Sequence, residues 1–223
     1  MLLSPEDHAL VTAAVTRAER ESDGEIVTIV AAQSDAYHDV ALHYAVLAML
    51  LVPGLLAALP QSAIHWVEGL FFGWNAAFTR GGLMLALFTV LTLVFLIVRL
   101  TLAYLPLRMA LTPGSTKTRR VHRRAIQLFR TGCELKTRGR TGILLYLSLA
   151  EHRAEIVADR AIHEQVEPEV WGEAMAALVE EVKAGRPGAG MAAAVERIGA
   201  VLAEILPKTL DNPNELPDRL VEL

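Results

Sequence analysis

Two long apolar runs interrupt a chain whose two ends read as parts of a soluble domain. Residues 41–60 and 82–98 carry no Asp, Glu, Lys or Arg. At about 1.5 Å of rise per residue, such runs are about long enough to cross a hydrocarbon core of about 30 Å. Hydrophobic residues make up 53% of the chain, which is high for a purely soluble protein. The sequence therefore predicts a two-helix membrane hairpin.

The segment before the hairpin predicts a helix followed by a strand. Ser4 suits a helix N-cap, Pro5 suits the first helical position, and two acidic residues follow them. Apolar residues then recur at helical spacing. This stripe contains Leu10, Val11, Ala14, Val15 and Ala18, with Arg17, Glu19 and Arg20 outside it. The β-branched stretch "EIVTIVA", residues 25–31, predicts a buried strand.

The segment after the hairpin predicts a helix, a β-hairpin and two more helices. Residues 143–149 and 154–159 read as two strands, joined by a charged turn at residues 151–153. Helical stripes precede and follow them, and "GRPGAG" reads as the turn between the last two helices. These stripes contain Val121, Ala125, Leu128 and Phe129, then Trp171, Met175, Leu178, Val179 and Val182, then Met191, Val195, Ile198, Val201, Leu202 and Ile205.

The element order predicts an α/β fold in which helices flank a small mixed sheet, an α/β/α sandwich interrupted by the transmembrane hairpin. Neither half can bury its strands alone, so we expect the two halves to fold together. The expected divisions are residues 1–42 and 108–210 for the domain, 43–107 for the hairpin with its connecting loop, and 211–223 for a C-terminal tail.

The positive residues predict the membrane topology. Arg80 is the sole Lys or Arg between the two runs, whereas many follow the second one. They are Arg99, Arg108, Lys117, Arg119, Arg120, Arg123 and Arg124. Both ends of the chain are therefore expected in the cytoplasm, beneath a bacterial-type inner (plasma) membrane. The basic run beside a span favours contact with lipid headgroups over nucleic acid, and the net charge of -4 also argues against a nucleic-acid partner.

Aromatic residues are dense in the connecting loop. Trp66, Phe71, Phe72, Trp74 and Phe78 fall within about one dozen residues between the two apolar runs. This density favours an aromatic belt at the membrane–water interface, and an aromatic ligand cage is the alternative.

Several stretches resemble the TPM domain family, named for a thylakoid lumen protein, a photosystem II repair protein and a nematode receptor modulator. Residues 3–31, with Gly24, Glu25 and Ile26 at the strand start, resemble the family's opening. Residues 141–166 resemble its central hairpin, with Asp159 in the place of an acidic motif residue. Trp171, the Gly185 and Gly190 pair, and residues 212–218 complete the resemblance.

The resemblance implies an α/β/α sandwich, a family label of phosphatase, and cation binding at acidic loops in some members. Many relatives carry their membrane segment after the domain, so the inserted hairpin is a departure. The resemblance favours a binding or accessory module for membrane-protein maintenance or partner regulation, with a phosphomonoester hydrolase as the alternative.

The strand directions predict a site at one end of the sheet. A crossover connection makes the first two strands parallel, and the hairpin makes the third antiparallel. Glu25 begins the first strand and Asp159 ends the third, so both fall at the same end, with Thr141 and Arg160 close by. The two carboxylates are candidate ligands for Ca²⁺ or Mg²⁺, or a candidate catalytic acid and base. Alternatively, Glu25 caps a helix and Asp159 pairs with Arg160.

Other candidate sites are weaker. Cys133 is the only cysteine, which excludes an internal disulfide, and a semi-buried cysteine without a special role is favoured over a nucleophile. The tail offers Asp211, Asn214, Glu215 and Asp218 as oxygen ligands, although a tail clamped onto the domain is favoured. "GRPGAG" lacks the Lys-Ser/Thr ending of a phosphate-binding loop.

Overall fold

The computed structural model describes residues 2–72, 79–134, 141–209 and 215–223. The chain forms two units. Unit 1 contains Met1–Asp35 and Pro113–Leu223, and unit 2 contains Ala36–Thr112. The predicted hairpin limits, residues 43 and 107, both fall inside unit 2.

The elements of unit 1 are α1 (Pro5–Glu21), β1 (Glu25–Ala31), α6 (Gly114–Phe129), the π-helical turn η1 (Arg130–Glu134), β2 (Gly142–Ser148), β3 (Arg153–Ala158), α7 (Arg160–His163), α8 (Pro168–Lys183), α9 (Pro187–Ile205) and β4 (Val221–Glu222). Those of unit 2 are α2 (His38–Ala58), α3 (Gln61–Phe72), α4 (Arg80–Thr101) and α5 (Leu105–Leu111).

The first helix begins where its sequence predicts. The Ser4 hydroxyl accepts a hydrogen bond from the Asp7 backbone N–H at 3.1 Å, and the Asp7 carboxylate accepts one from the Ser4 N–H at 3.1 Å. This reciprocal capping box satisfies two N–H groups that have no partner within the helix.

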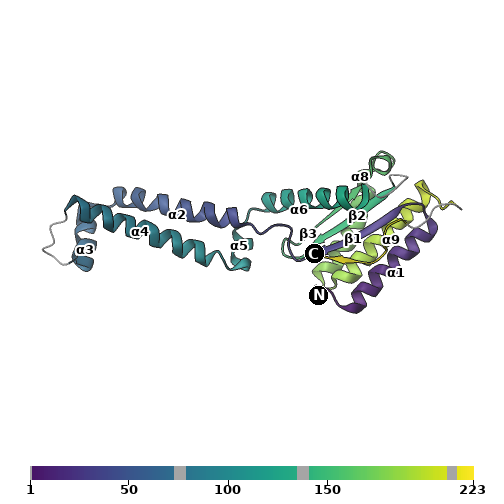
Figure 1. Cartoon of the computed structure of the whole chain (residues 1–223), viewed down its shortest axis with the longest axis horizontal. Helices are drawn as coiled ribbons and strands as arrows, with labels where there is room; N and C mark the ends of the chain where they lie inside the picture. Colours follow the sequence, from purple (N-terminus) through teal and green to yellow (C-terminus); the bar gives the residue numbers. More distant parts are fainter. Residues whose placement is uncertain (1, 73–78, 135–140, 210–214) are drawn as a thin grey trace. The chain divides into compact units, whose positions relative to one another are not determined.

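The sheet joins the two parts of the sequence that the hairpin separates. Its strand order is β3-β2-β1-β4. β1 pairs in parallel with β2, from Glu25 opposite Gly142 to Ala31 opposite Ser148, and β2 pairs antiparallel with β3. Both strand directions confirm the sequence prediction, and Figure 1 shows β1 and β2 together in one sheet. The short strand β4 has no counterpart among the predicted elements and pairs in parallel with β1.

Helices cover both faces of the sheet, which confirms the α/β fold with flanking helices. On one face, Ile26, Val30 and Leu145 pack against side chains of α1, α8 and α9. On the other face, Val27 and Leu144 pack against α6. In Figure 1, α1 and α9 lie on one side of the sheet and α6 on the other. Alternating side chains of β1 therefore enter two different cores.

Small residues bring the helices of the first layer close together. A Cβ atom built on Gly199 of α9 would lie 2.5 Å from the Cβ of Ala18 in α1, and one on Gly190 would lie 2.8 Å from the backbone oxygen of Leu178 in α8. A larger side chain at either glycine would push two helices apart. "GRPGAG" is only partly a turn, because α9 already begins at Pro187, a residue that suits the first helical position.

Unit 2 contains the predicted apolar helices. α2 and α4 contact each other, and each is long and apolar enough to cross a membrane. α4 has no buried side chain along its length. Trp66 of α3 is 60% exposed. Trp74 and Phe78 of the predicted aromatic belt lie outside the described residues, and so do the side chains of Phe71 and Phe72.

Candidate functional site

One end of the sheet gathers the two predicted acidic residues. Glu25 pairs with Gly142 in the sheet register, and Asp159, directly after β3, donates its backbone N–H to the Gly142 oxygen at 3.0 Å. The three residues form one row across β1, β2 and β3. Because neighbouring strands lie about 4.8 Å apart, the Cα atoms of Glu25 and Asp159 are about 10 Å apart.

The Glu25 carboxylate holds the C-terminal tail. Glu25 is 3% exposed. Its Oε2 accepts the backbone N–H of Leu216 at 3.1 Å and its Oε1 that of Glu215 at 3.4 Å. Burial raises the pKa of Glu25, and the two N–H donors oppose that rise. Glu25 thus caps tail amides rather than the helix considered as its alternative role.

The Asp159 carboxylate joins the two ends of the β2–β3 hairpin. Asp159 is 5% exposed, and its Oδ2 accepts the backbone N–H of Gly142 at 3.0 Å. The alternative in which Asp159 pairs with Arg160 does not hold. The Arg160 side chain is 90% exposed and its Nε donates to Glu164 at 2.6 Å, one helical turn away. The Arg160 guanidinium is therefore exposed and pairs with Glu164 instead of Asp159.

Thr141 makes two hydrogen bonds with the backbone at the start of β1. Its backbone oxygen accepts the Glu25 N–H at 3.1 Å, and its hydroxyl donates to the Asp23 backbone oxygen at 3.1 Å. The structure thus brings Glu25, Asp159 and Thr141 to one end of the sheet and leaves out Arg160. The side chains of all three residues form hydrogen bonds with backbone groups.

Two further acids at this end are absent from the predicted site. Glu19 of α1 is 8% exposed, and its Oε1 accepts the Ile26 backbone N–H at 2.8 Å. Its other oxygen is buried with no hydrogen-bond donor among the described residues. Asp218 lies beside it and accepts the Thr16 hydroxyl at 2.6 Å.

Glu19 is therefore a buried acid whose pKa is strongly raised. Burial, followed by the negative charges of Glu25 and Asp218, raises the pKa of Glu19 to about 8. The group is predominantly protonated at neutral pH. Its position is detectable in the sequence, because Glu19 continues the spacing of Val11 and Val15, one turn apart along the apolar stripe. The prediction that Glu19 lies outside that stripe is wrong.

The cation site expected at Glu25 and Asp159 stays a prediction. The described residues contain no group of three or more His, Cys, Asp or Glu side chains placed to hold a metal ion. Ca²⁺ takes 6–8 oxygen ligands, whereas both oxygens of Glu25 and one oxygen of Asp159 already accept backbone N–H groups. Of the proposed tail ligands, Asp211 and Asn214 lie outside the described residues.

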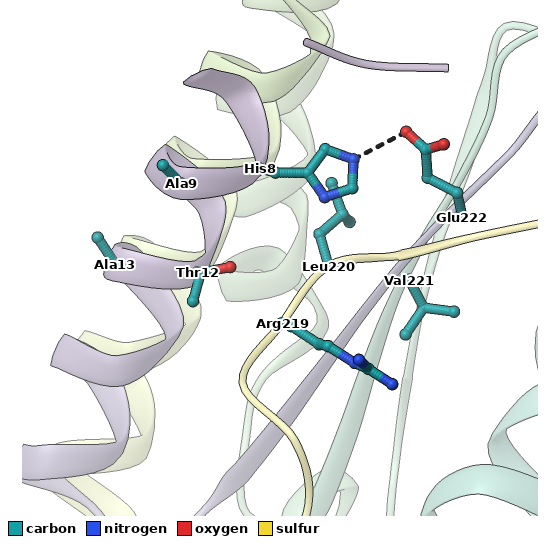
Figure 2. A pocket seen from close by; sticks show the side chains of 8 residues that line it. All are labelled: His8, Ala9, Thr12, Ala13, Arg219, Leu220, Val221 and Glu222. Atoms are coloured by element: carbon teal, nitrogen blue, oxygen red, sulfur yellow. Dashed lines mark hydrogen bonds and ion pairs between the residues drawn. The ribbon is translucent and has the colours of Figure 1, made fainter. Parts of the chain in front are cut away.

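A groove of about 770 Å³ lies between α1 and the tail. Its lining residues are His8, Ala9, Thr12, Ala13, Arg219, Leu220, Val221 and Glu222. Figure 2 shows the His8 ring facing the Glu222 carboxylate, with Nε2 and Oε1 2.8 Å apart, while the Arg219 side chain is directed away from that pair. The polar groups of the groove thus do not converge on one point.

Glu222 fastens the last strand to the start of the chain. Its carboxylate also accepts the backbone N–H groups of Leu2 at 2.9 Å and Leu3 at 3.0 Å. The hydrogen bond from His8, and then those from the two N–H groups, lower the pKa of Glu222 to about 2. We call the contacts made by Glu25, Asp218 and Glu222 the carboxylate clasp. Each joins the tail to α1, to β1 or to the N-terminal residues.

The fold and site define a three-layer α/β domain. A helical hairpin interrupts its sequence, and its own carboxylates hold the C-terminal tail on the domain. Residues 107–201 match the family model of the TPM domain, which confirms the resemblance over that part of the chain. The match begins after α1 and β1, which the sheet nevertheless places in the same unit as the matched residues.

A solved structure shares the fold. The NMR structure of the BA42 protein from the psychrophilic bacterium Bizionia argentinensis has a TM-score of 0.57 and 15% sequence identity, with 100% of this chain and 97% of that chain covered. No curated protein matches the sequence. At that identity, the likeness concerns the fold alone.

Proposed function

We propose that this protein is a membrane-anchored TPM domain that acts as a binding or accessory module for a membrane-protein partner, rather than as a hydrolase. The observation that carries the proposal is that the two candidate catalytic carboxylates, Glu25 and Asp159, are buried and accept backbone hydrogen bonds. A carboxylate that holds the fold together is poorly placed to activate a nucleophile or to protonate a leaving group.

The proposed location is a bacterial-type inner membrane, with unit 1 in the cytoplasm. The length and composition of α2 and α4 support two spans. The excess of Lys and Arg after the second span supports a cytoplasmic position for both ends. A domain anchored in this way reaches only partners at the same membrane surface, which suits a role in the maintenance or regulation of membrane proteins.

A hydrolysis assay tests the choice between module and enzyme. The full chain in detergent is given a generic phosphomonoester, alongside Asp159→Asn and Glu25→Gln variants purified identically. We expect the same background rate in all three proteins. Turnover by the native chain that both substitutions abolish, with folding intact by circular dichroism, would establish the phosphatase instead.

The same three proteins test cation binding. We expect their thermal unfolding to be unchanged by Ca²⁺ or Mg²⁺, because the described residues offer no open set of oxygen ligands. A cation-dependent rise in the melting temperature that Asp159→Asn removes would show that these carboxylates bind a metal ion.

Thiol labelling tests the topology. Ser62 in α3 and Ser115 in α6 are both exposed, so each can be replaced by cysteine in a Cys133→Ser background. A membrane-impermeant maleimide should label Ser62→Cys in intact spheroplasts and Ser115→Cys only after permeabilisation. The reverse pattern would place unit 1 outside the cell.

A further inference from the structure

The outer surface of α6 is a stripe of positive charge without acidic residues. The helix contains Lys117, Arg119, Arg120, Arg123 and Arg124, and neither Asp nor Glu occurs between Gly114 and Phe129. Like charges one helical turn apart destabilise a helix. The arrangement is therefore unfavourable for an isolated helix, and nearby negative charge would relieve it.

The geometry of α6 separates a packing face from a charged face. Val121 and Ala125 are fully buried against the sheet. Arg119 and Arg123 of α6, and Arg130 directly after it in η1, are exposed and recur at i, i+4 and i+11, which places them along one side of the helix. These three residues are the arginine stripe. Arg130 also lines a pocket with Asp159 and Glu164.

The arginine stripe is not neutralised by the domain itself. The described partners of α6 involve other residues: Arg120 lies 3.0 Å from the Asp35 carboxylate, and His122 lies 3.2 Å from Glu155. None of the three stripe arginines has an ion pair or hydrogen bond to a side chain that the structure describes.

We propose that the arginine stripe of α6 binds the headgroups of anionic phospholipids. α4, long and apolar enough to span a bilayer, ends at Thr101, and α6 begins at Gly114 after the short helix α5, so the stripe begins in the first helix of unit 1 that follows a candidate span. Basic residues close to a span on the cytoplasmic side attract anionic lipids. This inference rests on the proposed membrane anchoring and adds a second contact with the bilayer.

Nucleic acid is the other polyanion that such a stripe could attract. The net charge of the chain is -4, which disfavours binding of a long polyanion, whereas a short stripe next to a span needs only a few lipid headgroups. Each basic residue near an anionic surface contributes a factor of about five to binding, so three contribute on the order of a hundredfold.

Site-resolved arginine labelling tests the proposal on the intact chain. The native protein is reconstituted in phosphatidylcholine liposomes with and without about one-third phosphatidylglycerol, treated with a neutral dicarbonyl reagent and analysed by mass spectrometry. We expect labelling of Arg119 and Arg123 to slow at least about fivefold in the anionic liposomes. Labelling of the exposed Arg20 and Arg219 should be unchanged. Equal labelling of the stripe in both liposomes would overturn the proposal.

Two additions identify the source of the negative charge. Soluble glycerol phosphate or a DNA duplex is added to the protein in phosphatidylcholine liposomes at the same total charge. We expect neither to protect the stripe. Protection by glycerol phosphate would assign it to a free phosphate ligand, and protection by DNA to nucleic acid, and either result would overturn the lipid assignment.

Charge-matched variants provide the second readout. Phosphatidylglycerol should raise the melting temperature of the native chain, because a ligand that binds the folded state stabilises it. The triple variant Arg119→Gln, Arg123→Gln and Arg130→Gln should lose this rise, while a control triple variant at Arg20, Arg197 and Arg219 should keep it. Equal loss in both variants would indicate a general charge effect and contradict the proposal.

Resistance to carbonate extraction separates this inference from the proposed anchoring. If the native chain resists extraction but the arginine stripe shows no lipid dependence, only the lipid contact fails. If the chain is extracted, the membrane anchor itself fails.

Discussion

Replacement of Glu19 by Gln should stabilise the domain at neutral pH. In the native chain, the buried carboxyl group accepts the Ile26 N–H through one oxygen and lies beside Asp218. A glutamine keeps the acceptor for Ile26 and, like the protonated carboxyl group, carries a hydrogen-bond donor on its other terminal atom. It also cannot ionise, so it never places a second negative charge next to Asp218.

The size of the effect follows from the pKa of Glu19, which rises from 4.5 to about 8 on folding. Between these values the folded protein holds a proton that the unfolded chain has released, so the free energy of unfolding falls as the pH rises. Because Glu19 is only 8% exposed, little solvent screening reduces this term. Linkage gives a native penalty of about 3 kcal/mol at pH 7, and close to none near pH 4.5.

Thermal unfolding of the full chain in detergent across this pH range measures the effect. For a domain of this size, about 3 kcal/mol corresponds to about 6–12 °C in melting temperature. The gain of Glu19→Gln over the native chain should appear between pH 4.5 and 8 and be largest at the alkaline end. Glu21→Gln, an exposed change two residues further along α1, should shift stability by less than about 0.5 kcal/mol. A gain that does not vary with pH, or a loss of stability at pH 7, would show that Glu19 is not held protonated by burial in the folded domain.

Two further predictions concern packing and the clasp. Gly199→Ala should destabilise unit 1 by about 1–3 kcal/mol, because its new methyl group meets Ala18. Gly172→Ala, whose Cβ has open space, should instead stabilise α8 by about 0.5–1 kcal/mol. Chemical denaturation of both variants tests this, and a similar effect at both glycines would contradict it. Glu222→Gln should lower the melting temperature at neutral pH, and this gap should close in acid as the native carboxylate is itself protonated through its pKa of about 2. A gap of constant size down to that pH would show that the charge of Glu222 is not what holds the strand.

The elements of the fold were predictable because each has a strong local signal. β1 is a run of β-branched residues after a helix stop, and β2 and β3 are two short strands joined by a charged turn. The parallel pairing of β1 with β2 follows from the crossover rule even though a hairpin intervenes. The N-cap of α1 follows from the residue types at Ser4 to Asp7.

The parts that escaped prediction depend on contacts between distant residues. β4 has only two residues, too few for any periodic pattern, and its place beside β1 depends on the pairing of Glu222 with His8 across nearly the whole chain. Glu19 looks like a solvated acid by residue type, and only its position on the apolar stripe indicates burial. The strand directions predicted that Glu25 and Asp159 lie at the same end of the sheet. The backbone N–H groups that donate to their carboxylates belong to residues distant in the sequence, Leu216 and Gly142, and only the folded structure reveals them.

A disulfide between β1 and β2 would show directly that the two halves of the domain share one sheet. Ala31 and Ser148 are opposite each other in the β1–β2 register, and neighbouring strands lie about 4.8 Å apart, within disulfide range. With Cys133 changed to Ser, the pair Ala31→Cys and Ser148→Cys should oxidise readily in membranes and shift mobility on a non-reducing gel. The pair Ala31→Cys and Ala158→Cys, at opposite ends of the sheet, should remain reduced. Failure of the first pair to cross-link, or equal cross-linking of both, would contradict the joining of the two halves in one sheet.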